Sequence, residues 1–388
     1  MEADVESGSH DDAVKVVLAS LPAFGHLYPL VPLALALERT GAEVVFATGE
    51  EFASRLPART VPGAEESWAF SDATSEIARR VEQLGEAASD EGLGQTLFVE
   101  LCAPHVVDVM TGVLERERPD LVVFEQSNVG AAMAAHTTDI RAFCLAIVGW
   151  GRQWSTIYET VAAMVHAPVA GALAEGLIDP HPPFLADVDA TPPFPTMAMR
   201  PTAWSPDGPV QPWLLEPRRA PRVYLTMGTV FGSVDLLRAA ALEIAGSGCD
   251  VLVATGPGIE PSALGDMPAA VHVEQEVPQA HLLPYVDLVV HHGGTGTVIG
   301  SLASGLPQIV MPQGADQFWN ADHLAAEGAC RIVPPGAPPG SIAAAATALI
   351  KQQAPEREAA RRLGGVIAAM PSPDAVAQQL QATLAEPR

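Results

Sequence analysis

The chain has very little lysine. Lys15 and Lys351 are the only lysines among 21 basic residues, which face 46 acidic ones, and the formal net charge is -25 at pH 7. Nucleic acids and anionic membranes attract basic surfaces, so we expect neither as a partner. If the protein binds a phosphate group, lysine side chains cannot do most of the holding.

Other scarce or absent features narrow the class of protein. No run of about 18 apolar residues occurs, so no membrane-spanning helix is expected. The polar, acidic segment from Met1 to Asp12 lacks the basic start and apolar run of a secretion signal. The four cysteines are scattered without paired spacing, which favours buried thiols in a reducing cytoplasm.

Apolar strands alternate with helical segments, which predicts an α/β fold. Residues 14–20 form a largely apolar run, typical of a strand buried on both faces. Residues 30–37 have helical spacing, Gly41 caps that helix, and residues 43–47 form the next strand, which makes a βαβ unit of a parallel sheet. Further strands are expected at residues 121–124, 142–148, 223–227, 250–255, 271–277, 288–291 and 308–311.

A proline-rich stretch separates two such α/β halves. Twelve prolines fall between Pro180 and Pro221, and no periodicity survives there, which is typical of a stiff linker. A chain of 388 residues also exceeds what one core usually supports. We therefore predict two parallel-sheet domains, with ligands in the cleft at the carboxyl ends of the strands.

The strongest motif is Asp-Leu-Val-Val-His-His-Gly-Gly-Thr-Gly-Thr at residues 287–297. A buried strand, a glycine-rich turn and a helix start follow one another. The glycines allow a close backbone approach, and the unpaired N–H groups of the helix start form an anion site that needs no lysine. The alternative is a tight turn that binds nothing. Walker A and GxGxxG spacings are absent, which weakens the ATPase and dinucleotide-binding hypotheses.

No metal is expected at the paired histidines of this motif. His291 and His292 leave a strand in sequence, so their side chains point to opposite faces and do not easily share one ion. No cluster of carboxylates stands beside them in the sequence to complete a ligand set.

A second motif, Pro-Gln-Gly-Ala-Asp-Gln at residues 312–317, also joins a strand end to a helix. The carboxylate of Asp316 and the amide of Gln317 suit the vicinal hydroxyls of a sugar. Asp is equally a common helix cap, so this pattern alone leaves both readings open.

A histidine and a carboxylate stand at the same ends of two predicted strands. His26 follows the first strand, and Glu125 ends the strand that begins near residue 121. A carboxylate bonded to one imidazole nitrogen fixes the tautomer and raises the basicity of the other. The alternative is that His26 is a structural hydrogen-bonding residue of a loop.

Taken together, these motifs resemble the GT-B glycosyltransferases of family 1, and among them the bacterial enzymes that decorate polyketide, enediyne and macrolide natural products. The matches occur in family order from about residue 14 to residue 330. The matching stretches are residues 25–30, 46–49, 227–229, 277–279, 291–297 and 313–317 with Asn320. Residues 150–221, where such enzymes build the acceptor pocket, match poorly.

The resemblance implies a role for each matched residue. His26 falls on the catalytic base, and Glu125 stands where the family usually has the aspartate that orients it. His291 and Thr295 fall on phosphate contacts, and Glu276 replaces an aromatic residue that stacks on the nucleobase in many relatives. The full set of implied donor-binding residues is Gly228, Thr229, Val277, Gln279, His291, Gly293, Gly294, Thr295, Gly296, Thr297, Asp316 and Gln317.

Four aromatic residues are expected to line an apolar acceptor pocket: Phe24, Trp150, Trp154 and Tyr158. The last three fit core packing almost as well. The resemblance also implies an acceptor-binding domain at residues 13–205, a nucleotide-sugar domain at residues 206–372, and a C-terminal helix at residues 373–388 that packs back on the first domain.

The function that the resemblance implies is inverting, metal-independent transfer of a deoxy sugar from a nucleoside diphosphate to a hydroxyl of an apolar natural product. The nucleotide is expected to be dTDP, with UDP as the alternative. No resident cofactor is implied, and a homodimer is compatible with the family. One rival is a nucleotide-sugar 2-epimerase of similar fold, which would need several acid–base carboxylates around the sugar. The other is a sugar-nucleotide sensor without catalysis.

Overall fold

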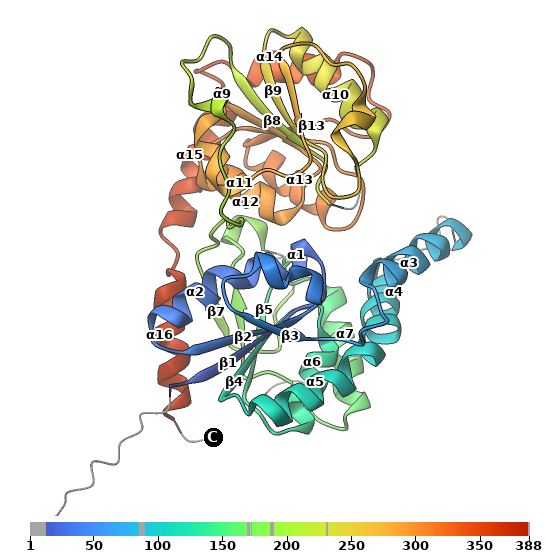
Figure 1. Ribbon diagram of the computed structural model, residues 1–388, viewed down its shortest axis with the longest axis vertical. Coiled ribbons are helices and arrows are strands. Elements are labelled where there is room, and N and C mark those ends of the chain that lie inside the picture. Colours follow the sequence, from blue (N-terminus) through green and yellow to red (C-terminus); the bar gives the residue numbers. More distant parts are fainter. Residues whose placement is uncertain are drawn as a thin grey trace, which may run out of the picture.

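The computed structural model describes residues 13–84, 90–168, 171, 173–186, 190–229 and 232–386. Two α/β domains lie one above the other along the long axis of the molecule (Figure 1). Each domain contains one parallel sheet covered by helices, so the predicted architecture of two Rossmann-like domains is confirmed.

The N-terminal domain is built on a seven-stranded parallel sheet with the order β3-β2-β1-β4-β5-β6-β7. Its central strands β1 and β4 are almost wholly buried, as their apolar sequences predict. Helix α2 ends at Arg39, and Gly41, two residues further on, has φ +88° as expected of a glycine cap. The strands are β1 (Lys15–Ala19), β2 (Glu43–Thr48), β3 (Arg59–Pro62), β4 (Leu121–Glu125), β5 (Ala142–Leu145), β6 (Gly176–Asp179) and β7 (Thr196–Ala198).

The proline-rich stretch is more than a linker. It contributes β7 to the edge of the first sheet, where Leu177 donates a hydrogen bond to the carbonyl of Pro195. An edge strand tolerates neighbouring prolines because one side of its backbone needs no partner. The sequence pattern missed this strand because its three residues are too few to show a period.

The C-terminal domain has a six-stranded parallel sheet with the order β10-β9-β8-β11-β12-β13. Central strands β8 and β11 are buried on both faces. The strands are β8 (Arg222–Thr226), β9 (Asp250–Ala254), β10 (Val271–Glu274), β11 (Leu288–His291), β12 (Gln308–Val310) and β13 (Cys330–Ile332).

Helices cover both sheets, and the carboxyl ends of the two sets of strands face the space between the domains. The described α-helices are α1 (Phe24–Leu27), α2 (Val31–Arg39), α3 (Phe70–Leu84), α4 (Asp90–Gln95), α5 (Ala103–Glu117), α6 (Val129–Thr137), α7 (Arg152–Met164), α9 (Pro212–Leu215), α10 (Val234–Gly246), α11 (Gln279–Leu282), α12 (Thr295–Ala303), α13 (Gln317–Ala326), α14 (Ser341–Leu349), α15 (Pro355–Ala368) and α16 (Pro373–Leu384). The 3₁₀ segments are η1 (Tyr28–Leu30), η2 (Glu50–Arg55), η5 (Pro183–Leu185), η6 (Pro261–Leu264) and η7 (Leu283–Tyr285), and a π-helical segment, η4 (Thr96–Cys102), joins α4 to α5.

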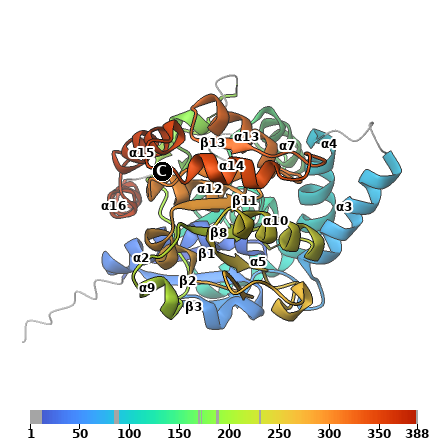
Figure 2. The ribbon, with the colours of Figure 1, turned by 90° about the horizontal axis from the view of Figure 1, so that it is seen from above.

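Helices α3 and α4 project from the side of the N-terminal domain in both ribbon views (Figures 1 and 2). The continuous helical run Gly92–Glu117, which includes most of α4, η4 and α5, is long and apolar enough to cross a membrane by length and composition. Core helices of globular proteins have the same signature. Here α5 buries Val106, Met110 and Leu114 in the core of the domain.

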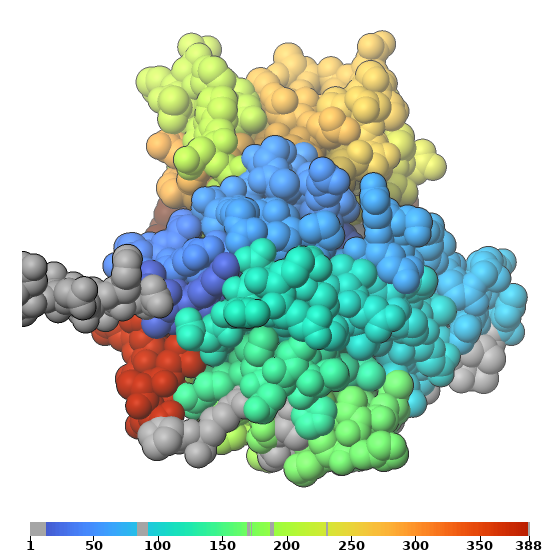
Figure 3. Space-filling model, turned by 60° about the horizontal axis from the view of Figure 1, so that its bottom comes forward, coloured from blue at the N-terminus to red at the C-terminus, as the bar shows by residue number. Residues whose placement is uncertain are grey.

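The C-terminal helix α16 returns to the N-terminal domain. It packs along α2, with Val376, Ala377 and Leu380 buried in the core beneath that helix. Arg39 of α2 also forms an ion pair with Asp374 at 2.6 Å. In the space-filling view α16 (red) lies against the N-terminal domain, far along the sequence from its neighbours there (Figure 3).

Candidate active site

A cavity of about 500 Å³ lies between the two domains and is lined by residues of both. Its N-terminal wall is formed where β1, β5, β6 and β7 end, and includes Phe24, His26 and Phe70. Its C-terminal wall is formed by the turns after β8, β9, β11 and β12. Each parallel sheet therefore presents the ends of its strands to one shared space, where ligands of such folds bind.

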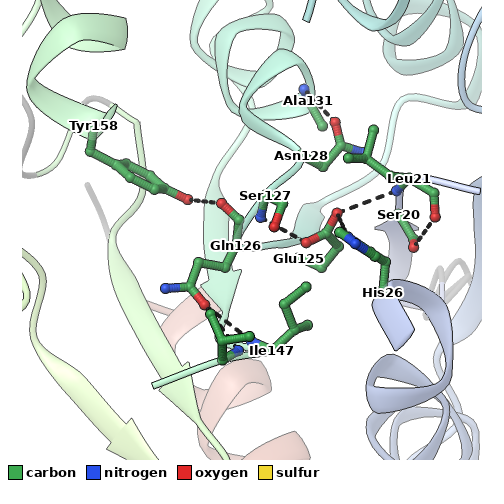
Figure 4. Close-up of polar contacts among 11 residues, drawn as sticks. Ser20, Leu21, His26, Glu125, Gln126, Ser127, Asn128, Ala131, Ile147 and Tyr158 are labelled. Carbon is green, nitrogen blue, oxygen red and sulfur yellow. Dashed lines mark hydrogen bonds and ion pairs between the residues drawn. The ribbon is translucent and has the colours of Figure 1, made fainter. Parts of the chain in front are cut away.

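His26 and Glu125 form a hydrogen-bonded pair on the N-terminal wall (Figure 4). His26 lies in α1, directly after β1, and Glu125 is the last residue of β4, which is paired with β1. The distance from Nδ1 of His26 to Oε1 of Glu125 is 3.1 Å. The longer glutamate therefore does reach the imidazole from the position where an aspartate was expected.

The carboxylate of Glu125 is held from several sides. It is fully buried, and the backbone N–H of Ser127 donates to its second oxygen at 2.7 Å. The backbone N–H of Leu21 donates to the first at 3.4 Å. With Nδ1–H of His26 donating to this fixed carboxylate, Nε2 carries the free lone pair. The arrangement can accept a proton from a group in the cavity.

Two phenylalanines that sequence reasoning missed surround the imidazole. The ring of Phe70 meets His26 edge-on at 5.1 Å between centroids, and Phe98 lies at 6.3 Å. They come from α3 and η4, which show no motif of their own. In the sequence, the helical spacing of the apolar residues around Phe70 and Phe98 was the only indication that these two side chains are partly buried.

The structure corrects three of the four expected acceptor residues. Phe24 lines the cavity, whereas Trp150, Trp154 and Tyr158 are buried in the core of the N-terminal domain and are not part of its wall. The hydroxyl of Tyr158 donates to the carbonyl of Gln126 at 2.9 Å, which ties α7 to the end of β4. Trp154 supports the site from behind, because it stacks on Phe98 at 5.5 Å.

A second histidine–carboxylate pair stands at the end of β6. Nδ1 of His181 lies 2.8 Å from Oδ1 of Asp179, and the backbone N–H of His181 donates to the same oxygen at 2.9 Å. His181 lines the cavity, and its buried Nε2 has no hydrogen-bond partner among the described residues. The sequence placed this residue in a proline-rich linker, although it follows a strand end just as His26 does.

On the C-terminal wall the two adjacent histidines have different surroundings. His291 is fully buried, its Nε2 lies 2.7 Å from the side-chain oxygen of Gln308, and its Nδ1 accepts from the backbone N–H of Gly293 at 3.0 Å. Burial lowers the pKa of His291 to about 3. Because both ring nitrogens of His291 already form hydrogen bonds within the protein, this side chain stabilises the turn. Its assignment as a direct phosphate contact is therefore wrong.

His292 lines the cavity in its place. Burial lowers the pKa of this imidazole to about 4, so it is neutral at pH 7. Its ring lies between two glycines, because a Cβ added to Gly228 or to Gly294 would come within 2.5 Å of it. Gly228, at φ +73°, therefore leaves room for the histidine and for the turn that carries Thr229 into the cavity wall.

The start of α12 also faces the cavity. Gly294, Thr295, Gly296 and Thr297 line it, while Gly293 is buried behind them with φ +103°. Gly294 is the N-cap and offers no side chain to the first N–H groups of the helix. These free donors and the helix dipole form a site for an anion such as a diphosphate.

Asp316 and Gln317 lie beside this helix start. Asp316 is the N-cap of α13 but makes no capping hydrogen bond. Its carboxylate instead accepts hydrogen bonds from the hydroxyl of Thr295 at 2.8 Å and from the amide of Asn320 at 2.9 Å. Gln317 uses its side-chain oxygen to hold the turn, accepting from the N–H of Gln313 at 2.8 Å. Asp316 is therefore oriented at the cavity wall and does not serve as a simple helix cap.

Val277 and Gln279 line the far end of the same wall. The side-chain oxygen of Gln279 accepts from the hydroxyl of Thr297 at 3.2 Å, which connects this loop to α12. The structure thus brings every expected donor-binding residue together at one wall, with His291 and Gly293 as buried supports.

Comparison with known proteins agrees with this architecture. The structure superposes on the glycosyltransferase SsfS6 of Streptomyces sp. SF2575, complexed with thymidine diphosphate, with a TM-score of 0.76 and 24% identity over 95% of this chain and 99% of that one. The two α/β domains, their shared cleft and this structural similarity show that the chain has the GT-B fold of glycosyltransferases.

Sequence comparison then identifies the family. The model of the erythromycin biosynthesis protein CIII-like C-terminal domain matches residues 244–383. The chain is 32% identical over 384 residues to the L-demethylnoviosyl transferase of Streptomyces niveus, covering 95% of this chain and 98% of that protein. It is 29% identical to the elloramycin glycosyltransferase ElmGT of Streptomyces olivaceus, covering 96% and 98%. The chain belongs to the natural-product glycosyltransferases of antibiotic biosynthesis and is an enzyme that transfers sugars.

Proposed function

We propose that this enzyme transfers a deoxy sugar from a dTDP-linked donor to a hydroxyl of an apolar natural-product aglycone, with inversion at the anomeric carbon. This proposal rests on one observation: the two walls of the cavity carry different chemical groups. The His26–Glu125 pair stands on one side, and the start of α12 with Asp316 stands on the other.

The reaction is a single displacement. The acceptor hydroxyl loses its proton to Nε2 of His26 as its oxygen bonds to the anomeric carbon, and the bond from that carbon to the diphosphate oxygen breaks. Glu125 orients the imidazole and stabilises its charged form. A base placed in this way contributes roughly 10²–10⁴-fold in rate.

The departing diphosphate takes the negative charge. The N–H groups at the start of α12 and the neutral imidazole of His292 are the donors available for it. Donors fixed in advance around a developing anion contribute roughly 10²–10³-fold each. The sugar between the two walls is held by Asp316 and Gln317.

The choice of dTDP rests on the relatives. SsfS6 is a fold neighbour whose structure contains thymidine diphosphate, and the family acts in antibiotic biosynthesis, where the resemblance also favours deoxy sugars. Calorimetry with dTDP and with UDP tests the choice. UDP binding about tenfold tighter, or about 1.4 kcal/mol, would overturn it.

Family membership argues against a sensor, and the cavity argues against an epimerase. Among the described residues that line the cavity, Asp316 and Glu276 are the only carboxylates, and Glu276 is bonded to Arg55. Few groups are therefore left for the acid–base steps of an epimerase around the sugar.

The decisive experiment combines the enzyme with dTDP-sugars and a panel of aromatic aglycones. We expect a glycoside by mass spectrometry, with an anomeric configuration by NMR opposite to that of the donor. A product of retained configuration would contradict the displacement, and release of free sugar-nucleotide epimer without transfer would support the epimerase.

A further inference from the structure

An ion pair joins the two domains across one end of the cavity. Arg55 ends η2 in the N-terminal domain, and Glu276 follows β10 in the C-terminal domain. Nη1 of Arg55 lies 2.5 Å from Oε2 of Glu276, and Nη2 lies 3.1 Å from Oε1. Both residues line the cavity. Two parallel contacts of this kind fix the relative orientation of the groups as well as their distance.

Aromatic residues of the N-terminal domain hold the guanidinium in place. It lies over the ring of Phe24, 5.3 Å from the centroid, in the range of a cation–π contact. Phe24 packs edge-on against Phe52 at 5.1 Å and against Tyr28 at 5.3 Å. The hydrogen bond to Glu276 raises the pKa of Arg55 further above its ordinary value, so the guanidinium stays charged. A guanidinium supported in this way loses less freedom when it meets a partner.

The order of strands shows which end of the cavity the pair covers. The anion site at the start of α12 follows β11, and Asp316 follows the neighbouring strand β12. Strands β8, β9 and β10 lie on the other side of β11. A donor with its diphosphate at α12 and its sugar at Asp316 therefore extends its nucleoside toward β10, where Glu276 stands.

We propose that Arg55 and Glu276 form a clasp over the nucleoside of the bound donor. Arg55 is then a positioning residue: it acts through Glu276 to hold the loop that precedes Val277 against the N-terminal domain. The nucleotide leaves only when the clasp opens. Affinity for a ligand of the C-terminal domain thus depends on a side chain of the acceptor domain. This inference rests on the proposed nucleotide-sugar donor.

Both side chains are partly exposed, at 35% for Arg55 and 44% for Glu276. An exposed ion pair is weakened by salt and contributes about 0.2–1 kcal/mol, which is a factor of up to about five in a rate or an affinity. The clasp is therefore strong enough to slow release and weak enough to open in each catalytic cycle.

The test is the dissociation rate of dTDP carrying a fluorescent methylanthraniloyl label, chased with unlabelled dTDP. We expect Arg55→Gln and Glu276→Gln each to speed dissociation about two- to fivefold, and the double variant to equal either single one. Arg55→Lys should recover part of the effect, and so should the charge-exchanged double variant Arg55→Glu with Glu276→Arg. Salt should speed release from the unmodified enzyme more than from the double variant.

Arg59 provides a matched control. Its guanidinium makes the same kind of two-point contact with Glu117, at 3.0 and 2.6 Å, but within the N-terminal domain and outside the cavity. Arg59→Gln should leave dTDP release unchanged, and thermal melting should show that every variant is folded.

Two results would overturn the clasp while leaving the proposed function intact. One is unchanged release from both single variants of an enzyme that still transfers sugar. The other is multiplication of the two single effects in the double variant, which would mean that the residues act separately. Failure of the unmodified enzyme to bind either dTDP or UDP would instead overturn the proposed function, and the clasp with it.

Discussion

The hydroxyl of Thr295 donates a hydrogen bond to a carboxylate oxygen of Asp316 at 2.8 Å. The amide of Asn320 bonds to both of them, at 3.0 Å to the hydroxyl and 2.9 Å to the carboxylate. The first residue of α12, at the anion site, is therefore bonded to the residue expected at the sugar. One hydrogen-bond network therefore connects the proposed diphosphate site to the proposed sugar site.

Replacement of Asp316 by asparagine should affect the sugar far more than the nucleotide. An amide removes the charge that strengthens hydrogen bonds to sugar hydroxyls, which is worth about 1.5–3 kcal/mol, or roughly 10- to 150-fold in kcat/KM. Affinity for dTDP alone should change less than about threefold. Asp322→Asn, an exposed carboxylate on the same helix, is the control. If the substitution weakened the binding of dTDP and of the dTDP-sugar equally, Asp316 would contact the nucleotide and not the sugar.

Loss of His26 should remove proton transfer and spare binding. We expect His26→Ala to lower kcat by roughly 10²-fold or more with little change in dTDP affinity, because the base lies on the wall opposite the donor. Glu125→Gln should give a milder loss, since the imidazole stays but loses its anionic partner. His105, paired with Glu65 at 2.7 Å outside the cavity, provides the control His105→Ala. Near-normal turnover of His26→Ala would place the base elsewhere.

The adjacent histidines should fail in different ways. His292→Ala should weaken dTDP binding about two- to tenfold, the value of one hydrogen bond, and should slow departure of the diphosphate. His291→Ala should mainly destabilise the protein, by about 2–4 kcal/mol in the free energy of unfolding, because it leaves Gln308 and Gly293 without their buried partner. Calorimetry and urea unfolding separate the two. A folded His291→Ala variant of normal stability that cannot bind dTDP would restore the direct phosphate role.

A fall in pH should destabilise the protein, because His291 and His292 are buried in their neutral form. In the unfolded chain both imidazoles take up protons near pH 6.5, whereas burial lowers the folded pKa values to about 3 for His291 and about 4 for His292. The unfolded state binds more protons between those limits, so stability falls as the pH drops from about 6.5 toward 4. Urea unfolding at pH 7.5 and 5 should show a loss of up to about 2 kcal/mol per histidine. The loss should be smaller in His292→Asn, and an equal loss there would assign the effect to other groups.

Transfer should not require a divalent metal. Within the parts of the chain that the structure describes, no group of three or more His, Cys, Asp or Glu side chains could hold one. The diphosphate is proposed to meet backbone donors instead. Activity after dialysis against excess EDTA should equal that of the untreated enzyme. Loss of activity that Mg²⁺ or Mn²⁺ restores would refute this description of the site.

Much of the site follows from features within a single domain. The apolar runs identify β1, β4 and β11, and parallel pairing puts their carboxyl ends at one edge, so His26 and Glu125 meet as expected. The glycine-rich turn before α12 also lies where its sequence indicates. These features depend on local pattern and on the geometry of one sheet.

The features that the sequence did not show depend on which face of a strand end a residue occupies, and on packing between distant segments. Whether His291 or His292 faces the cavity is set by one residue at the end of β11, where the alternation of a strand gives way to a turn. Trp154 and Tyr158 are residue types that commonly line ligand pockets. In the structure, the face of α7 that carries them packs against the core. The contact between Arg55 and Glu276 requires both domains to be placed together, which no local pattern encodes.

The return of α16 to the N-terminal domain has a consequence for building hybrids of such enzymes. Val376, Ala377 and Leu380 complete the hydrophobic surface beneath α2, although more than 330 residues separate the two helices along the chain. A ribosome must therefore release the chain through α16 before the N-terminal domain can finish folding. A chimera that exchanges donor specificity by joining two parents at the proline-rich segment should also carry α16 from the parent that supplied α2. Otherwise the two helices meet with mismatched surfaces, and the hybrid is expected to express poorly whatever sugar its new half recognises.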